Sequence, residues 1–345
     1  MEKKVVTFGE VMLRLTPSNH LRFTQTKCFD AIFSGAEADV AIALSHLGVP
    51  ADFVTRLPLN DIGDACINYL RQFGVGVNHI IRGGDRIGIY FYEVGVAQRS
   101  SKIIYDRANS AFATIKAGMV NWSEVFRNAC WFHWTGINPA VSETAAEACL
   151  EAVKEAKNHG LTVSCDLNYR SQLWKWGKKP TEVMSELVGH VDIVTANEED
   201  ADKVFGIKAP DVDVERGKVK PENYLAVAQK LMKRFPNLKL VGTTLRESIS
   251  ATHNIWTGVL YDGQKLYKTQ VYDIYPIIDR IGTGDTFSAG IIYGLLKFGD
   301  DLQKTLDFAT AMSCLKHTIY GDSPIIRIEE VETLMKGIAS GRIIR

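Results

Sequence analysis

Apolar residues along the chain follow two alternating patterns, one typical of β-strands and one typical of α-helices. Strand-like runs such as "KVVTFGEVMLRL", "ADFVTRL", "ACWFHWTG", "LTVSCDLN", "VDIVTAN" and "NLKLVGTTL" stand between segments of helical periodicity. Helices are predicted over residues 36–48, 61–74 and 142–160, the last with Ser142 as its cap, and a long helix should follow Asp285. Such alternation is the signature of an α/β fold, with a mostly parallel sheet covered by helices on both faces.

Two segments interrupt this alternation. Residues 11–33 and 88–108 have the polar alternation of short strands, and no helix follows them. We interpret them as a small β-sheet that forms a lid. The core would then consist of residues 1–10, 34–87 and 109–345. A charged stretch flanked by prolines, residues 208–221, is interpreted as a solvated surface insertion.

Composition narrows the possible partners. The 345 residues include 40 basic and 40 acidic side chains, so no net field would attract nucleic acid or an anionic membrane, and neither is an expected partner. The six cysteines are far apart and form no Cys-x-x-Cys pair, which argues against a zinc site and a disulfide framework. No run has the apolar length of a signal peptide or a membrane span. We therefore expect a cytoplasmic protein.

The stretch "IDRIGTGDTFSAG", residues 278–290, places a carboxylate at the start of the predicted long helix. The turn Gly282-Thr283-Gly284 should present free N–H groups at the positive end of the helix dipole, which together form an anion site. If a phosphate lies there, Asp285 could face an incoming hydroxyl and take its proton, as phosphoryl transfer requires. Alternatively, Asp285 only caps the helix, where aspartate is favoured. The spacing alone leaves both interpretations open.

Four motifs resemble those of the ribokinase-like (PfkB) carbohydrate kinases, in the same order along the chain. They are "FSGAEADVAIALSHLG", "DLNYR", "ANEEDADKVFG" and residues 279–290. The resemblance implies a three-layer α/β/α sandwich with a mostly parallel central sheet and a small β-sheet lid. It also implies ATP and Mg²⁺ as cofactors, Asp285 as the catalytic base, and the turn from Gly282 through Thr283 and Gly284 to Asp285 as the anion hole.

Further stretches resemble the 2-keto-3-deoxygluconate kinase branch of this family, namely "GEVMLRLTP", "YDRANSAFA" and "DLNYRSQLW". For the sugar acid, the resemblance implies contacts with Gly35, Asp39, Tyr90, Tyr105, Arg107, Arg170, Asp285 and Asp322. For the nucleotide, it implies Asn168, Asn197, Thr243, Arg246, Ser248, Gly282 and Gly284. For Mg²⁺, it implies Asn197 and Asp200. Arg107 and Arg170 would hold the carboxylate of the substrate from opposite sides and so present its 6-hydroxyl to Asp285.

Two other functions remain open. The first is a kinase for a neutral sugar such as fructose, which the arginine cluster disfavours because a neutral sugar offers a guanidinium no charge partner. The second is a nucleotide-binding protein without catalysis, which would gain nothing from a carboxylate beside the terminal phosphate.

Three further expectations concern single features. Arg14, taken alone, is interpreted as a surface residue. His133 is interpreted as a histidine of the core or its rim, and not as a base. The strand edges and aromatic residues of the two lid segments are costly to leave in water, so we expect them to pair between protomers, giving a dimer or a higher homo-oligomer.

Overall fold

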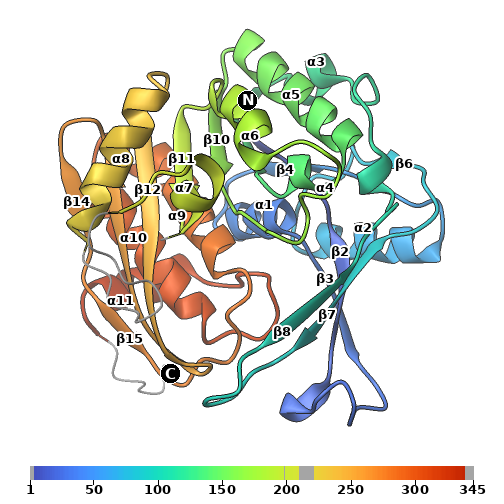
Figure 1. The fold of residues 1–345 in the computed structure, drawn as a ribbon, viewed down its shortest axis with the longest axis horizontal. Helices are drawn as coiled ribbons and strands as arrows, with labels where there is room; N and C mark the ends of the chain where they lie inside the picture. Colours follow the sequence, from blue (N-terminus) through green and yellow to red (C-terminus); the bar gives the residue numbers. More distant parts are fainter. Residues whose placement is uncertain (1–3, 198, 210–220, 339–345) are drawn as a thin grey trace.

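The computed structural model describes residues 4–197, 199–209 and 221–338. Within them, the centre of the molecule is a nine-stranded sheet (Figure 1). Its strands, in order across the sheet, are β14 (Leu266–Lys268), β13 (His253–Tyr261), β12 (Leu240–Ser250), β11 (Ile193–Ala196), β10 (Thr162–Asp166), β9 (Ala129–Thr135), β1 (Lys4–Phe8) and β4 (Ala51–Val54), with β15 (Tyr272–Ile274) also paired to β13. Every pairing from β12 to β4 is parallel, and β13 pairs antiparallel with its neighbours. The predicted α/β class with a mostly parallel sheet is confirmed.

Helices cover both faces of this sheet. The first face is packed by α3 (Trp122–Val125), α5 (Glu143–Asn158), α6 (Pro180–Val188), α7 (Asp200–Phe205) and α8 (Asn223–Arg234), with the short α4 (Asn138–Val141) leading into α5. The second face carries α1 (Ala36–His46), α2 (Asp61–Gln72), α9 (Thr283–Phe298), α10 (Leu302–Lys316) and α11 (Ile328–Met335). Ser142 caps α5 as predicted, because its Oγ accepts a hydrogen bond from the N–H of Ala145 at 3.1 Å.

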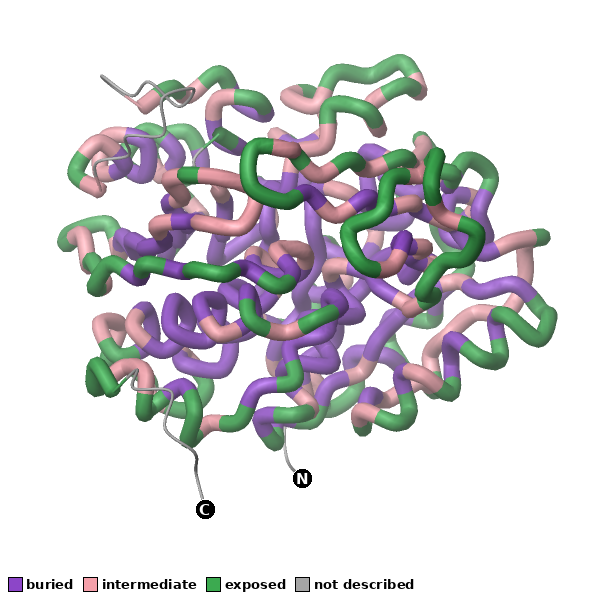
Figure 2. The backbone as a smooth tube through the Cα atoms, turned by 90° about the horizontal axis from the view of Figure 1, so that it is seen from below, coloured by how far each residue is buried: buried purple, intermediate pink, exposed green. Residues whose placement is uncertain are grey.

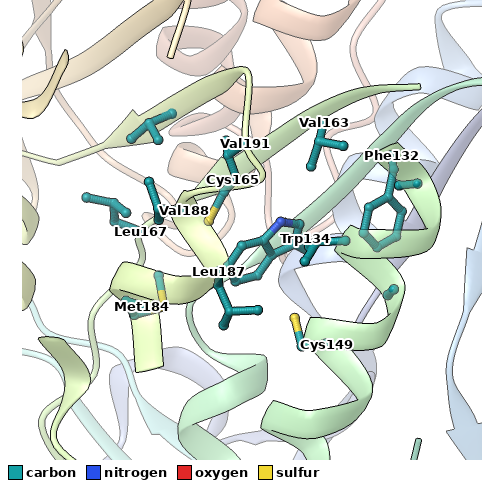
Figure 3. Packing of buried hydrophobic residues seen from close by; sticks show 14 of the residues in the cluster. Phe132, Trp134, Cys149, Val163, Cys165, Leu167, Met184, Leu187, Val188 and Val191 are labelled. Atoms are coloured by element: carbon teal, nitrogen blue, oxygen red, sulfur yellow. The ribbon is translucent and has the colours of Figure 1, made fainter. Parts of the chain in front are cut away.

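The core lies between the sheet and these helices. Strand residues alternate between the two faces, so Phe132 and Trp134 pack on the first face and Trp131 packs on the second. Figure 3 shows the ring of Trp134 among Cys149, Leu187 and other apolar side chains of the first face. Buried backbone concentrates in the middle of the molecule and exposed loops lie around it (Figure 2). Among the described residues, no helix combines the length and the apolar character that crossing a membrane requires.

A second, four-stranded sheet projects away from the main body (Figure 1). Its strands, in order, are β3 (Asp30–Ser34), β2 (Met12–Thr16), β7 (Gly88–Glu93) and β8 (Lys102–Asp106). A two-stranded pair, β5 (Arg56–Leu57) with β6 (Ile81–Arg82), completes the strands of the described residues. The small sheet arises from the two segments predicted as a lid, and its role as a lid stays a prediction. Residues 210–220 of the predicted surface insertion lie outside the described residues.

Helices α9 and α10 approach each other closely because α9 carries glycine at the contact. A Cβ atom added to Gly290 would lie 2.5 Å from the Cα of Ala309. One added to Gly294 would lie 2.7 Å from the Cγ2 of Thr305. Both distances are shorter than any ordinary van der Waals contact. The two glycines, one helical turn apart, therefore fix how α9 lies against α10.

Candidate active site

A cavity opens at the carboxyl ends of the parallel strands, which is where ligands bind in open α/β sheets. The loops that follow β10 and β11 meet there with residues of β12 and with the start of α9. Residues that line it include Asp166, Asn168, Arg170, Asn197, Asp200, Thr244, Arg246 and the run from Arg280 to Asp285. We call it the inner cavity.

A second cavity adjoins the first on the side of the small sheet. Arg170, Asn197, Asp200 and Arg246 line both. The second cavity is also bounded by Ser101, Ile103 and Tyr105 at β8. We call it the outer cavity. Together the two cavities connect the glycine turn of α9 with the small sheet.

The glycine turn has a backbone geometry that only glycine adopts easily. Gly282 precedes the first residue of α9 and has φ of 82°, in the left-handed region. A Cβ at this position would lie 2.2 Å from the carbonyl oxygen of Asp322. The first turn is held by Ser313, whose Oγ donates to the carbonyl of Thr283 at 2.7 Å. The first-turn N–H groups of a helix have no partner within the helix, so this turn can bind an anion.

Asp285 lies in the first turn of α9, three residues after Gly282, which occupies the cap position. Burial raises the pKa of Asp285 to about 6, while the positive charge of Arg170 acts in the opposite direction. The negative charge of Asp322 raises it further, and Lys316 lowers it. The pKa of this carboxyl group is therefore close to neutral pH, which suits a group that accepts and releases protons.

Asn197 and Asp200 form a reciprocal pair at the start of α7. The Oδ1 of Asn197 accepts the N–H of Asp200 at 3.1 Å, and the Oδ2 of Asp200 accepts the N–H of Asn197 at 2.9 Å. The other oxygen of Asp200 accepts the N–H of Tyr169 at 3.0 Å. The prediction that both residues lie together at a helix start beside the glycine turn agrees with this placement.

Asp166 at the end of β10 was not predicted as a site residue, although it opens the motif "DLNYR". One of its oxygens accepts the N–H of Asn168 at 3.1 Å, and the other lies 3.8 Å from where a Cβ of Gly284 would be. Burial, and next the charges of Asp200 and Asp285, raise its pKa well above the ordinary value. Asp166 could have been identified from its position, because it is a carboxylate at the carboxyl end of a predicted parallel strand, where ligands bind in α/β sheets.

The predicted substrate residues divide into two groups. Arg170 and Tyr105 line the cavities. Tyr90, Asp322 and Asp39 are buried behind them, and none lines either cavity. The hydroxyl of Tyr90 donates to Asp322. Asp39 accepts a hydrogen bond from Ser323 at 3.2 Å, and Gly35 begins α1 where a Cβ would lie 2.2 Å from the carbonyl oxygen of Glu10.

Arg107 does not face the cavities. It is 5% exposed and forms an ion pair with Glu10, whose Oε2 accepts the Nε–H of Arg107 at 2.8 Å. The other oxygen of Glu10 accepts the hydroxyl of Ser110 at 2.5 Å. The structure therefore brings Arg170 to the cavities but leaves Arg107 with a carboxylate partner inside the protein. The expected grip of the substrate carboxylate by both arginines stays a prediction.

The interpretation of Arg14 as a surface residue is wrong. Its side chain is 0% exposed and bridges two loops, with Nη2 at 2.6 Å from Asp279 and Nη1 against Asp322. The guanidinium also lies 4.6 Å from the ring centre of Tyr92. His133, in contrast, is confirmed as a core histidine, because it is buried and burial lowers its pKa to about 3.

The nucleotide residues predicted on β12 differ in their position relative to the inner cavity. Thr244 and Arg246 line the inner cavity, whereas Thr243 does not, because successive strand residues point to opposite faces. Ser248 is exposed and lies beyond the residues that line the cavities. Asn168 lines the inner cavity as predicted. Arg280, next to the turn, was not predicted and also lines it.

Comparison with known proteins gives one family over most of the chain. The model of the pfkB family carbohydrate kinases matches residues 2–326. The crystal structure of a 2-dehydro-3-deoxygluconokinase from Thermotoga maritima is 46% identical, covers 97% of this chain and 100% of that chain, and has a TM-score of 0.92. A 2-dehydro-3-deoxygalactonokinase from Haloferax volcanii is 31% identical over 343 residues, 99% of each chain.

A crystal structure described as a putative ribokinase II from E. coli is 21% identical, covers 97% of this chain and 99% of that chain, and has a TM-score of 0.79. At this identity the likeness shows the fold alone, and it confirms the ribokinase-like architecture. The resemblance carried by the four sequence motifs is confirmed as well, and the protein is an enzyme of the carbohydrate kinase class. The chain belongs to the pfkB family of carbohydrate kinases.

Proposed function

We propose that the protein transfers the terminal phosphoryl group of ATP to the 6-hydroxyl of 2-keto-3-deoxygluconate. The observation that carries this proposal is Asp285, which lies beside the glycine turn in a cavity that Arg170 also lines. A general base works best with a pKa near the operating pH, and burial raises the pKa of Asp285 to about 6. The names of the relatives from Thermotoga maritima and Haloferax volcanii, both kinases of a dehydro-deoxy sugar acid, support this substrate class.

The turn from Gly282 to Asp285 would serve as the anion hole. In phosphoryl transfer, charge spreads over the three equatorial oxygens of the moving group, and fixed N–H dipoles aimed at them need no reorganisation. Asp285 would take the proton of the attacking hydroxyl while its oxygen forms the bond to phosphorus. The proton then resides on Asp285 and leaves to solvent after ADP departs.

The acidic residues of the inner cavity fit a Mg²⁺ ion that arrives with the nucleotide. Among the described residues, no cluster of three or more His, Cys, Asp or Glu side chains could hold a metal by itself. Mg²⁺ is usually held by one or two carboxylates together with substrate phosphates. Burial and the negative charge of Asp200 raise the pKa of Asp166, so a cation between these two carboxylates would be favoured. Asp166, Asp200 and Asn197 would hold the ion. When bound, Mg²⁺ neutralises charge on the phosphate oxygens.

Arg170 is our choice for the partner of the sugar carboxylate. It lines both cavities, so it can reach a substrate that lies between the small sheet and Asp285. A planar guanidinium grips a carboxylate through two parallel hydrogen bonds. Arg107, already paired with Glu10, would support the wall behind the substrate. The small sheet, which supplies Tyr105 to the outer cavity, would act as the lid.

The first experiment is an ADP-release assay with acid and neutral sugars at matched concentrations, followed by location of the phosphate in the product by ³¹P NMR. We expect the highest kcat/KM with 2-keto-3-deoxygluconate and a 6-phosphate product. The Haloferax volcanii relative makes 2-keto-3-deoxygalactonate a second candidate, so this epimer belongs in the panel. A higher kcat/KM with fructose or ribose would overturn the sugar-acid assignment. ATP binding without turnover of any sugar would favour a non-catalytic protein.

The second experiment is the Asp285→Asn variant. The amide keeps the shape of the side chain but cannot accept the proton, so turnover should fall by about 10²–10⁴-fold while ATP binding is retained. Asp61→Asn is the matched control, because Asp61 is an exposed residue in the first turn of α2 and lies outside both cavities. Near-normal turnover of Asp285→Asn would refute the base assignment.

A further inference from the structure

Arg280 occupies a position in the inner cavity that the proposed mechanism does not use. It precedes Gly282 by two residues, and its Nη2 donates to the carbonyls of Ser250 at 3.2 Å and Ala251 at 2.6 Å, where β12 turns into β13. Its Nε is buried and has no hydrogen-bond partner. The side chain thus spans the gap between the glycine turn and the far end of β12, and part of its hydrogen-bonding capacity is unused.

Arg280 is half-buried, and its charge is not balanced by a direct ion pair as that of the buried Arg14 is. Arg14 lies between Asp279 and Asp322. For Arg280, no ion pair with a carboxylate is formed within the described part of the chain. Burial and next the positive charge of Arg246 lower its pKa, and Tyr92 and Asp279 offset these effects only in part. Two guanidinium groups close enough to repel each other at one cavity favour an anion that contacts both.

We propose that Arg280 is a further catalytic residue, which binds the phosphate chain of ATP together with Arg246. This inference rests on the proposed function, since it takes ATP as the ligand of the inner cavity. A guanidinium presents its N–H groups in a planar fork that matches phosphate oxygens. Contact with phosphate oxygens that gain charge during transfer stabilises the transition state more than the bound substrate. Both kcat and the affinity for ATP therefore depend on Arg280.

A different role for Arg280 would be purely structural, as a brace that holds the β12–β13 turn through the carbonyls of Ser250 and Ala251. The two roles predict different responses to the length of the phosphate chain. If Arg280 only holds the β12–β13 turn, its loss disturbs the whole nucleotide site, and the affinities for AMP and ATP would fall equally. A phosphate ligand that is lost affects ATP and leaves AMP nearly unchanged.

The test is calorimetric titration of the purified full-length protein with AMP, ADP and ATP, without sugar, for the wild type and Arg280→Met. We expect ATP affinity to fall roughly 10- to 100-fold in the variant, the range for loss of charge-assisted hydrogen bonds, and AMP affinity to stay within about twofold. In the kinase assay, the KM for ATP should rise and kcat should fall, while the KM for the sugar acid stays constant.

Two further variants complete the design. Arg280→Lys keeps a positive charge and a donor for the Ala251 carbonyl but lacks the fork, so it should recover part of the ATP affinity and remain testable if Arg280→Met does not fold. Arg234→Met is the matched control, because Arg234 also donates to a backbone carbonyl, that of Phe205 at 3.2 Å, and lies outside both cavities.

The outcomes separate this inference from the proposed function. Equal losses for AMP and ATP, or wild-type ATP affinity in Arg280→Met, would overturn the role of Arg280 while the kinase assignment stands. A wild-type protein that binds no ATP would overturn the proposed function, and this inference with it.

Discussion

Replacing Asp285 with asparagine should stabilise the folded protein at pH 8 even as it lowers turnover. Burial raises the pKa of this carboxyl to about 6, from an ordinary value of 3.8. At about 1.4 kcal/mol per pH unit, the difference means that the ionised group opposes folding by about 3 kcal/mol. Asparagine resembles the protonated form in shape and charge, so the variant escapes this penalty. We expect its free energy of unfolding to exceed that of the wild type by up to about 3 kcal/mol.

The gain should depend on pH with a definite sign. Between pH 3.8 and about 6 the folded state holds the proton on Asp285 and the unfolded state does not. The contribution of this residue to stability is therefore highest below pH 3.8, falls as the pH rises through this window, and stays low above it. The variant has no such fall. The difference in free energy of unfolding between the variant and the wild type should be largest at pH 8 and much smaller at pH 4.5.

Urea unfolding followed by tryptophan fluorescence at these two pH values measures the difference directly. Asp61→Asn provides a control of opposite sign, because an exposed acid in the first turn of a helix interacts favourably with the helix dipole. Its loss should destabilise the protein by about 0.3–1 kcal/mol. If Asp285→Asn were less stable than the wild type at pH 8, or its gain were the same at both pH values, the reasoning would be refuted.

Four further predictions concern activity and assembly. Below about pH 6, kcat/KM should fall by about tenfold per pH unit, because Asp285 must be ionised to accept a proton; a profile that is flat down to pH 5 would contradict this. Excess chelator should abolish turnover and added Mg²⁺ should restore it; full activity in chelator would exclude a metal role for Asp200. Arg170→Met should raise the KM for the sugar acid by roughly 10- to 100-fold and barely affect weak turnover of neutral sugars; an unchanged KM would remove Arg170 from the carboxylate site. Phe29 and Ile104 on the small sheet are 39% and 53% exposed, so we expect at least a dimer; a monomeric mass in light scattering at micromolar concentration would count against it.

Features that depend on neighbours in the sequence could be predicted without a structure. The alternation of strand and helix, the Ser142 cap and the glycine turn before Asp285 are all local, because each is determined by hydrogen bonds or burial within a few residues. No local pattern predicts that β13, β14 and β15 form an antiparallel edge of the sheet. The pairing of these strands depends on tertiary contacts between them.

Features that depend on partners far along the chain could not be predicted. Arg14 can be buried because Asp279 and Asp322, which are far along the chain, pair with it. No residue near Arg14 in the sequence predicts either of these partners. The ion pair of Arg107 with Glu10 likewise joins residues far apart in the sequence, and no motif predicts it. That Thr244 and not Thr243 lines the inner cavity depends on which face of the sheet each residue occupies, and a shift of one residue along a strand exchanges the two faces.

Under the proposed function, the close contact between α9 and α10 would give residues without a functional group an influence on phosphoryl transfer. Gly290 lies eight positions beyond Gly282, which at 1.5 Å per residue is about 12 Å along the helix axis. A single methyl group at Gly290 or Gly294 would press on α10, and because a helix moves as a rod, the displacement would reach the N–H groups at its other end. Phosphoryl transfer tolerates little misplacement of such donors. The direction of the N–H groups in the proposed anion hole would thus depend on two distant glycines, on the face of α9 that packs against α10.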